Sequence, residues 1–288
     1  MIFLDSFKLL SDREEHFALG GDTRMIYNSY YPFGLFSYKQ LREVKFDNIT
    51  IFYGGNGSGK TTLLNVIAEK IHANRKNKID KGNLFKLYVD GCEEGWKSTQ
   101  YDDIRMISSD DIFDYLLDIR AINTNVNRKK EELSREYLNN KFTDYRGYNS
   151  SMDNYEDLKD MVDAKKHTMS SYVRNKLMNN NIVEQSNGES ALMYWQKEIG
   201  ENSLYILDEP ENSLSAENQI KLKQFIEESV RFYNCQFIIS THSPFLLGLN
   251  YSRIYNLDTI PASITKWNEL PNVLTYYKFF KDREGDFE

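Results

Sequence analysis

Residues 49–71 read ITIFYGGNGSGKTTLLNVIAEKI, and the chain is organised around this stretch. Five β-branched or aromatic residues, from Ile49 to Tyr53, form the short apolar run that is typical of a buried strand. Apolar side chains then recur at helical spacing from Leu63 to Ile71, which predicts an amphipathic helix. A glycine-rich loop therefore joins a strand to a helix.

The loop fits the phosphate-binding pattern G-x-x-x-x-G-K-[ST], which requires this strand–loop–helix setting. Glycines let the backbone approach phosphate oxygens, consecutive N–H groups form an anion nest, and the helix dipole adds to the attraction. An ordinary glycine-rich turn is the alternative, and the matching flanks argue against it. Lys60 is expected to reach the β- and γ-phosphates, and the Thr61 hydroxyl to ligate Mg²⁺. We therefore expect a nucleoside triphosphate to be bound by Gly55, Asn56, Gly57, Ser58, Gly59, Lys60, Thr61 and Thr62.

The composition is that of an ordinary globular protein, with 40% hydrophobic and 27% charged residues among 288. That length allows one large domain or two small ones. The sequence shows no apolar run long enough to span a bilayer, no secretory signal, and no cysteine pattern for disulfides or metal. A reducing cytoplasm is the compartment predicted. The net charge of −7 argues against a protein that clamps nucleic acid by itself.

Residues 1–53 are predicted to be mostly β-structure, with strands at 2–10, 23–31, 41–46 and 49–53. The dipeptide Asp47–Asn48 is suited to a hairpin turn between the last two. Further strands are expected at 84–89 and 104–107, and Ser108 with Asp111 has the residues of a capping box. Phe33, Phe36 and Tyr38 are candidates to stack on a purine, although core packing is the more common role of aromatics. The basic loop 74–82 is either a solvated surface or a nucleic-acid contact.

Residues 109–182 are predicted to form an inserted helical lobe, including one long amphipathic helix at 155–178. Strands at 204–207, 236–240 and 254–257 then alternate with helices at 191–199, 216–233 and 272–283. The economical interpretation is a single α/β domain over residues 1–288 that carries the lobe.

Two further strands end in polar side chains. The strand at 204–207 leads into Asp208 and Glu209, which would hold Mg²⁺ and activate the attacking water, respectively. Solvated acids at a strand end are the alternative, and the presence of a phosphate loop favours the functional role. His242 follows the strand at 236–240, where ligands bind in open α/β sheets, and it could donate a hydrogen bond to the γ-phosphate.

Residues 186–190, SNGES, precede a predicted helix and offer a second phosphate site. One copy of the fold cannot easily direct both sites at the same phosphate, whereas two copies arranged head to tail can. In that arrangement each copy would complete the phosphate pocket of the other.

Together, the phosphate loop, SNGES, LDEPENSLS (207–215) and STHSP (240–244) resemble an ABC-type ATPase. The form of the last three is similar to the SMC/RecF/OLD-like branch and to its short bacterial AAA family ATPases without a fused nuclease. The resemblance implies a P-loop NTPase fold with a mixed β-sheet core, an N-terminal antiparallel β part and an inserted helical lobe. It also implies Glu209 as catalytic base, His242 as γ-phosphate sensor, and Mg²⁺ held by Thr61 and Asp208. It further implies that Ser186, Gly188 and Glu189 contact nucleotide across a homodimer that forms with ATP.

One departure from the family pattern concerns the strand that ends at Ile107, because no glutamine follows it. Asp110 or Asp111 is expected to take its place.

The function expected from the sequence is ATP hydrolysis that opens and closes a head-to-tail dimer and acts on a separate partner protein or nucleic acid, in genome maintenance or phage defence. Three alternatives stay open. They are the ATP-binding subunit of a membrane transporter, a module that senses ATP and hardly hydrolyses it, and an ATPase that clamps DNA alone.

Overall fold

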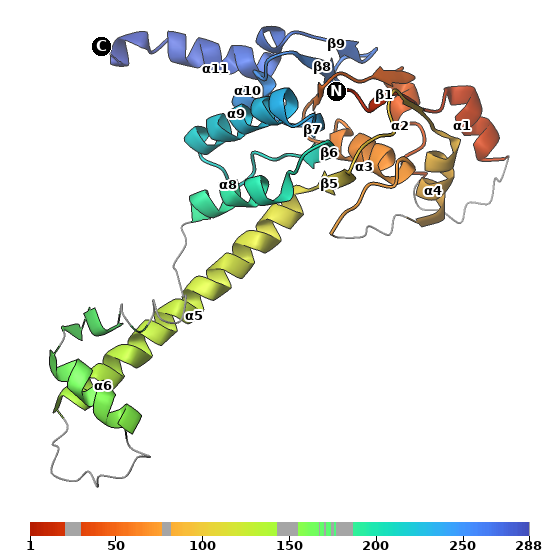
Figure 1. Ribbon diagram of the computed structural model, residues 1–288. Helices are drawn as coiled ribbons and strands as arrows, with labels where there is room; N and C mark the ends of the chain where they lie inside the picture. Colours follow the sequence, from red (N-terminus) through yellow and green to blue (C-terminus); the bar gives the residue numbers. More distant parts are fainter. Residues whose placement is uncertain are drawn as a thin grey trace. The chain divides into compact units, whose positions relative to one another are not determined.

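The computed structural model describes residues 1–20, 30–76, 82–142, 155–166, 168–169, 171–173, 176 and 187–287 (Figure 1). They fall into two compact units, one of Met1–Phe113 with Ala191–Glu288 and one of Asp114–Ser190. The first unit contains β1 (Leu4–Lys8), α1 (Asp12–Ala18), α2 (Leu35–Tyr38), β2 (Glu43–Lys45), β3 (Ile49–Tyr53), α3 (Lys60–Lys70), α4 (Gly82–Gly91), β4 (Glu93–Trp96), β5 (Asp103–Ile107), β6 (Ser203–Asp208), α9 (Ala216–Phe232), β7 (Gln236–Ser240), α10 (Pro244–Leu247), β8 (Ser252–Asn256), β9 (Ser263–Ile264), η3 (Trp267–Glu269), α11 (Pro271–Lys281) and η4 (Glu284–Asp286). Two helices, α5 (Ser109–Phe142) and α8 (Asn187–Glu198), have residues in both units.

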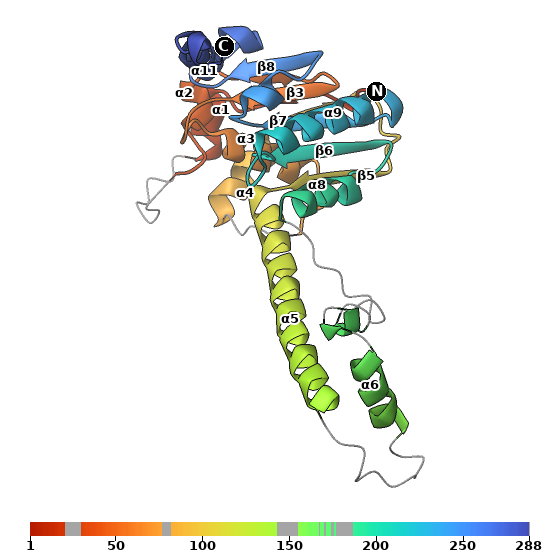
Figure 2. The same ribbon diagram turned by 90° about the vertical axis from the view of Figure 1, so that its left-hand side faces the viewer.

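The first unit is built on a six-stranded sheet in the order β5-β6-β7-β3-β8-β9. The first five strands are parallel, and β9 pairs antiparallel to β8. Every residue of β3, β6 and β7 is buried, as expected for parallel strands that are covered on both faces. Figure 2 shows α9 on one face of this sheet and α3 on the other. The three strands predicted to carry the site are therefore neighbours at the centre of the sheet.

The N-terminal strands form a separate antiparallel sheet in the order β2-β1-β4. The predicted hairpin at Asp47–Asn48 is wrong, because β2 pairs with β1 whereas β3 pairs with β7 and β8. The dipeptide instead connects the two sheets. Asp47 N–H donates to the Thr50 hydroxyl at 2.9 Å, so the local polar contacts suit a bend as well as a hairpin.

Two other expectations of β-structure are also corrected. Residues 84–89 belong to the helix α4, in which Phe85, Tyr88 and Val89 are buried at the three- and four-residue spacing of a helix face. Within the region expected to be mostly β, α1 begins after Ser11, which forms a capping box with Glu14. The strand expected at 23–31 lies almost wholly outside the described residues.

One buried side chain joins the two sheets. Gln236, at the start of β7, is fully buried, and its Oε1 accepts the N–H groups of Phe3 at 2.8 Å and Leu4 at 3.0 Å. Its Nε2 donates to the carbonyl oxygens of Leu4 at 2.8 Å and Asp47 at 3.1 Å. A single amide thus hydrogen-bonds to four backbone groups, three in the N-terminal segment and one in the connection between the sheets.

The second unit contains α6 (Tyr155–Lys166) and most of α5. The helix predicted at 155–178 is not continuous, because α6 ends at Lys166 and Thr168 is not helical. Tyr172 is buried beside Tyr137 of α5, and its hydroxyl donates to Glu136 at 2.8 Å. The boundaries 109–182 of the predicted lobe stay a prediction.

The buried amide generates a stability prediction. Gln236→Met keeps most of the side-chain volume and removes all four hydrogen bonds, so we expect the free energy of unfolding in urea to fall by about 2 kcal/mol or more. The matched control Gln224→Met, on the exposed side of α9, should change it by less than about 0.5 kcal/mol. Equal effects for the two variants would contradict the role of Gln236 as the link between sheets.

Candidate active site

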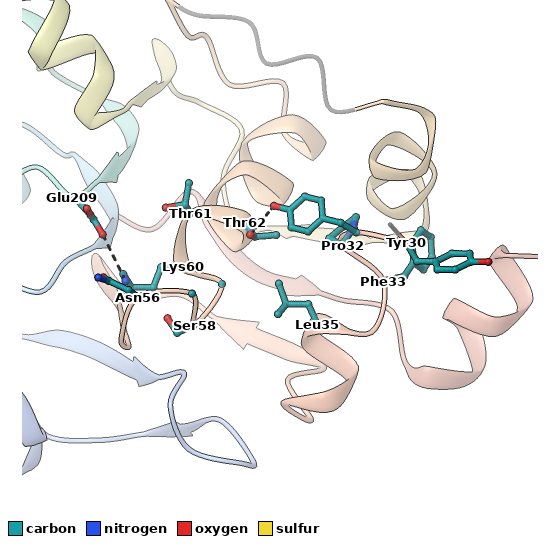
Figure 3. A pocket seen from close by; sticks show the side chains of 13 residues that line it. Tyr30, Pro32, Phe33, Leu35, Asn56, Ser58, Lys60, Thr61, Thr62 and Glu209 are labelled. Atoms are coloured by element: carbon teal, nitrogen blue, oxygen red, sulfur yellow. Dashed lines mark hydrogen bonds and ion pairs between the residues drawn. The ribbon is translucent and has the colours of Figure 1, made fainter. Parts of the chain in front are cut away.

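The phosphate loop borders an open cavity of 670 Å³. Figure 3 shows its lining, which comes from the loop after β3, the start of α3, the segment before α2, and the residue after β6. The lining residues are Tyr30, Tyr31, Pro32, Phe33, Leu35, Asn56, Gly57, Ser58, Gly59, Lys60, Thr61, Thr62 and Glu209.

The loop conformation depends on its glycines. Gly57 and Gly59 have φ angles of 78° and 94°, in the left-handed region that favours glycine. A Cβ atom on Gly54 would lie 2.5 Å from the Ser58 hydroxyl oxygen, so only glycine fits there. Gly54 and Gly59 are the two glycines that the pattern requires, and Gly57 occupies one of its variable positions.

The loop has the donor set that a triphosphate requires. Among the described residues, no acceptor lies within hydrogen-bond distance of the backbone N–H groups of Asn56, Gly57 and Gly59. The Ser58 hydroxyl is buried and also lacks a partner. A buried hydroxyl without a partner is unfavourable, and phosphate oxygens would satisfy it together with the three N–H groups. The loop residues therefore fit ATP.

Lys60 is 4% exposed and points back along the loop. Its Nζ donates to the carbonyl oxygens of Gly54 at 3.0 Å and Gly55 at 3.3 Å, and lies 2.7 Å from Nε2 of His242. Glu209 Oε1 is 3.7 Å from the same ammonium, the ion pair marked in Figure 3. The predicted base, Glu209, and the predicted sensor, His242, thus both lie close to the ammonium nitrogen of Lys60.

Asp208, the last residue of β6, lies beside the first turn of α3. The Thr61 hydroxyl donates to Asp208 Oδ1 at 3.1 Å, and the Ser240 hydroxyl, at the end of β7, donates to the same oxygen. Burial raises the pKa of Asp208, and the hydrogen bonds from Ser240 and Thr61 lower it in part. A buried carboxylate next to a hydroxyl is a donor set that suits Mg²⁺, with water and phosphate oxygens as the other ligands.

Glu209 follows Asp208 in the left-handed conformation, with φ of 48°. Its N–H donates to the Ser240 carbonyl at 3.0 Å, which fixes this turn to β7. Its Oε1 is 3.3 Å from His242 Nε2, and Oε2 accepts from the Asn212 amide at 3.3 Å. One nitrogen of His242 thus faces both Lys60 and Glu209. It cannot accept from the ammonium and donate to the carboxylate at once.

A carboxylate that the sequence did not indicate supports His242. Glu211 Oε1 accepts from the Thr241 hydroxyl at 2.7 Å and from the N–H groups of His242 at 2.6 Å and Ser243 at 3.1 Å. Burial raises the pKa of Glu211, and the His242 N–H lowers it in part. Its Oε2 is buried without a partner. The only sequence signal for this role was a second acid two residues after Glu209.

The three aromatic candidates for stacking on a purine lie in different environments. Phe33 lines the cavity, whereas Phe36 is fully buried in the core and Tyr38 is 71% exposed outside the lining. Tyr30 and Tyr31, which the sequence did not single out, also line the cavity. The Tyr31 hydroxyl donates to the Thr62 hydroxyl at 2.7 Å.

A second cavity of 220 Å³ adjoins the metal-binding candidates. It is lined by Thr61, Asn65, Arg75, Met106, Ser108, Ser109, Asp110, Asp111, Asp208 and Glu209. Asp111 is held by the Ser108 N–H and hydroxyl, both at 2.8 Å, which confirms the capping box. Its carboxylate is thus engaged at the start of α5, whereas Asp110 is exposed at the same opening.

The predicted second phosphate site is described only in part. Ser186 lies outside the described residues, and Gly188 and Glu189 fall in the first turn of α8, which begins at Asn187. The proposed contacts across a dimer therefore stay a prediction. The basic loop 74–82 is also only partly described. In its described part Arg75 donates to Asn65 at 3.1 Å, and Lys76 to Glu198 at 2.9 Å.

Two protein families match the chain. The family described as ABC transporter matches residues 42–212, which is more than half of the chain. The chain belongs to this family. A second family, described as AAA ATPase domain, matches residues 189–247, which include Asp208, Glu209 and His242. The chain is therefore an ABC-type ATPase that binds and hydrolyses ATP. The predicted P-loop α/β fold, with a mixed sheet and an N-terminal antiparallel sheet, is confirmed.

Several solved structures are similar to this ABC-type ATPase at low identity. One, described as a metal-chelate type ABC transporter in an inward-facing conformation, is 15% identical with a TM-score of 0.39, over 97% of this chain and 90% of that one. The SMC head domain from Thermotoga maritima is 12% identical with a TM-score of 0.34, over 91% and 98%. The Smc head domain from Pyrococcus furiosus, with an extended coiled coil and bound to the C-terminal domain of ScpA, is 13% identical with a TM-score of 0.39, over 99% and 100%. No curated protein matches the chain.

Two further observations bear on the metal and the membrane. Within the described part of the ATPase, no cluster of three or more His, Cys, Asp or Glu side chains is placed to hold a metal ion. A Mg²⁺ ion that relies on nucleotide and water for most of its ligands needs no such cluster. No helix of the described residues is both long and apolar enough to cross a bilayer.

The buried Asp208 carboxylate generates a second prediction. Because burial raises the pKa of Asp208, the folded chain holds this proton more tightly than the unfolded chain, and stability falls as pH rises from the unfolded pKa through the folded pKa. Asp208→Asn removes the charge, and its amide oxygen can still accept from Thr61 and Ser240. We expect the melting temperature of the nucleotide-free protein at neutral pH to rise by about 2 °C or more.

The matched control for this measurement is Asp90→Asn, at an exposed position on α4. It should leave the melting temperature unchanged. A lower melting temperature for Asp208→Asn, with an unchanged control, would show that the ionised carboxylate stabilises the fold.

Proposed function

We propose that this ABC-type ATPase uses Mg²⁺-dependent ATP hydrolysis to open and close a head-to-tail homodimer, which acts on a separate partner. The observation that carries the proposal is the meeting of Lys60, Thr61, Asp208, Glu209 and His242. They come from three adjacent parallel strands or from the helix after one of them. Polar atoms of Lys60, Glu209 and His242 lie 2.7–3.7 Å apart, and the Thr61 hydroxyl lies 3.1 Å from Asp208.

In this proposal Thr61 and Asp208 hold the metal ion, with Asp208 supported by the Ser240 hydroxyl. When bound there, Mg²⁺ would neutralise part of the phosphate charge. The loop N–H groups and Lys60 bind the phosphates and orient the γ-phosphate. Glu209 then accepts a proton from the attacking water as the bond between the γ-phosphorus and the bridging oxygen breaks, which leaves ADP and phosphate.

Lys60 and His242 change partners during this cycle. In the absence of phosphate, the Lys60 ammonium contacts two loop carbonyl oxygens and Nε2 of His242. Triphosphate oxygens attract the ammonium more strongly than a neutral imidazole does. Once Lys60 turns to phosphate, His242 can donate from Nε2 to the γ-phosphate or to Glu209. The site is thereby sensitive to whether a γ-phosphate is present.

The dimer part of the proposal rests on Ser186, Gly188 and Glu189, which would contact the nucleotide of the opposite copy. A γ-phosphate gripped from both sides favours the closed dimer, and its loss after hydrolysis favours opening. Shifting such an equilibrium almost completely takes a difference in affinity of about 10⁴-fold between the two states. Many charge-assisted contacts to one phosphate are a source of such a difference.

The nucleotide base has a place on the other side of the loop. Tyr30 and Phe33 line the cavity beyond Thr62 and offer aromatic faces for stacking with a purine (Figure 3). The Tyr31 hydroxyl is hydrogen-bonded to Thr62, so Tyr31 would connect the part of the site that binds the base to the part that binds the phosphates. This assignment keeps Phe33 from the sequence-based candidates and replaces Phe36 and Tyr38.

For the partner, we favour a separate effector protein or nucleic acid in genome maintenance or phage defence, a setting that rests on the motif resemblance alone. The family description favours the ATP-binding subunit of a membrane transporter as the second candidate. Purification with the membrane fraction, lost when a membrane partner is deleted, would favour the transporter. Release from membranes by buffer alone would favour the first candidate.

The catalytic part of the proposal is tested with Glu209→Gln. Phosphate release should fall by about 10²–10⁴-fold, since the amide cannot accept the proton from water, while ATP affinity stays close to that of the wild type. With ATP and Mg²⁺ the variant should accumulate as a dimer in light scattering. The control Glu201→Gln changes an exposed acid just before β6 and should retain wild-type turnover. Equally slow release by wild type and Glu209→Gln would exclude the base role.

The composite site is tested by mixing two inactive variants. Lys60→Ala disables the phosphate loop, and Ser186→Arg blocks the site offered to the opposite copy. Mixing them should restore about one working site per heterodimer. Mixing Lys60→Ala with Glu209→Gln is the control, and it should stay inactive because both changes affect the same half of a site. Absence of rescue in the first mixture would argue against sites shared between copies.

A further inference from the structure

The loop that carries His242 is bound from two distant parts of the sequence. On one side, the His242 N–H donates to Glu211 Oε1 at 2.6 Å, from the loop after β6. On the other, the side-chain amide of Asn272 donates to the His242 carbonyl oxygen at 2.7 Å, from the first turn of α11. Both backbone polar groups of His242 are therefore bonded to side chains, which fix the residue between them.

Asn272 occupies an unusual position for this residue type. Asparagine favours helix caps, where its side chain bonds the backbone of its own helix. In α11 the cap residue is Leu270, no side chain caps the helix, and Asn272 lies inside the first turn. Its side chain reaches away from α11 to the His242 loop instead. Local helix stability does not explain that choice, whereas a contact with the active-site loop does.

The backbone of Asn272 is also tied to the nucleotide site. Its N–H donates at 3.3 Å to the hydroxyl of Tyr53, the residue just before the phosphate loop. Leu270 and Val273 on either side are buried, which anchors the turn in the unit. After this turn α11 becomes exposed, with Leu274, Tyr277 and Phe280 between 48% and 62% accessible. The first turn of α11 is thus the part fixed to the active site.

We propose that Asn272 is a positioning residue for His242, and that α11 sets through this bond how well His242 meets the γ-phosphate. The inference rests on the proposed role of His242. Asn272 does not touch nucleotide. Its amide holds the His242 carbonyl, while Glu211 holds the N–H, so the imidazole is aimed at Lys60 and Glu209. Without the amide, the His242 backbone keeps one of its two side-chain hydrogen bonds and the imidazole moves away from that position.

The decisive variant is Asn272→Asp. It has the same shape, and a carboxylate in the first turn of a helix is favourable for the helix dipole, so the fold is retained. In place of a donor, however, it turns an anionic oxygen toward the His242 carbonyl. We expect kcat for ATP hydrolysis to fall by about 10- to 100-fold with KM and ATP affinity near wild type, because a small misplacement costs up to about 10²-fold. Asn272→Ala should show the same split with a smaller loss.

Asn268 provides matched controls. It is exposed on η3 and lines the same cavity as His242, but it makes no hydrogen bond to the His242 loop. Asn268→Asp and Asn268→Ala should therefore leave kcat unchanged. Thermal melts of all four variants show whether each is folded. If Asn272→Ala fails to fold, the comparison of Asn272→Asp with Asn268→Asp still decides.

A double-mutant cycle with His242→Ala separates this inference from the proposed function. If Asn272 acts through His242, Asn272→Asp should lower kcat in the wild type and have little further effect in His242→Ala. A loss of the same size in both backgrounds would overturn the inference, as would a raised KM with unchanged kcat or a wild-type kcat. If His242→Ala itself hydrolyses ATP at the wild-type rate, the proposed role of His242 fails instead.

Discussion

The hydrogen bond from Thr61 to Asp208 is the contact on which the rest of the site depends. It joins residues 147 positions apart, and it exists because β6, β7 and β3 are parallel neighbours whose carboxyl ends reach the same edge. The phosphate loop follows β3, so its lysine and threonine arrive at that edge with the acids of β6. Any change of strand order would separate the anion-binding loop from the carboxylates, and each half would be chemically inert alone.

Charge and burial explain why the site needs so many supporting bonds. Lys60 is almost fully buried, yet only one carboxylate, Glu209, lies within ion-pair distance among the described residues. Asp208 and Glu211 are carboxylates whose burial raises their pKa. Such groups are unfavourable in a resting protein and suit a site that awaits a polyanion and a cation. Hydroxyls and backbone N–H groups donate hydrogen bonds to these two carboxylates in the absence of ligand. The lower folding stability that results is typical of active sites.

The sequence predicted the parts of this fold that local chemistry determines. Apolar runs that are followed by polar residues or by a glycine-rich loop predicted β3, β6 and β7 together with their site residues. These patterns consist of consecutive residues, so they can be recognised in the sequence alone. It failed at 84–89, where β-propensity outweighed a helical spacing of Phe85, Tyr88 and Val89. It also failed at Asp47, because turn-forming residues do not show whether the next strand pairs with the preceding one or joins another sheet. Glu211 and Asn272 could not be found, since their roles come from contacts made only in the tertiary structure.

The strand β7 has consequences for how force travels in this molecule. Its first residue, Gln236, makes three hydrogen bonds with Phe3 and Leu4 at the N-terminal strand and one with Asp47, and the hydroxyl of its last residue, Ser240, donates to Asp208. A strand of five residues is a stiff rod of about 16 Å, held by hydrogen bonds along both edges. Tension applied to β1 would therefore be delivered along β7 to the Asp208 carboxylate. A mechanical load at one end of the chain has a direct route to the catalytic edge.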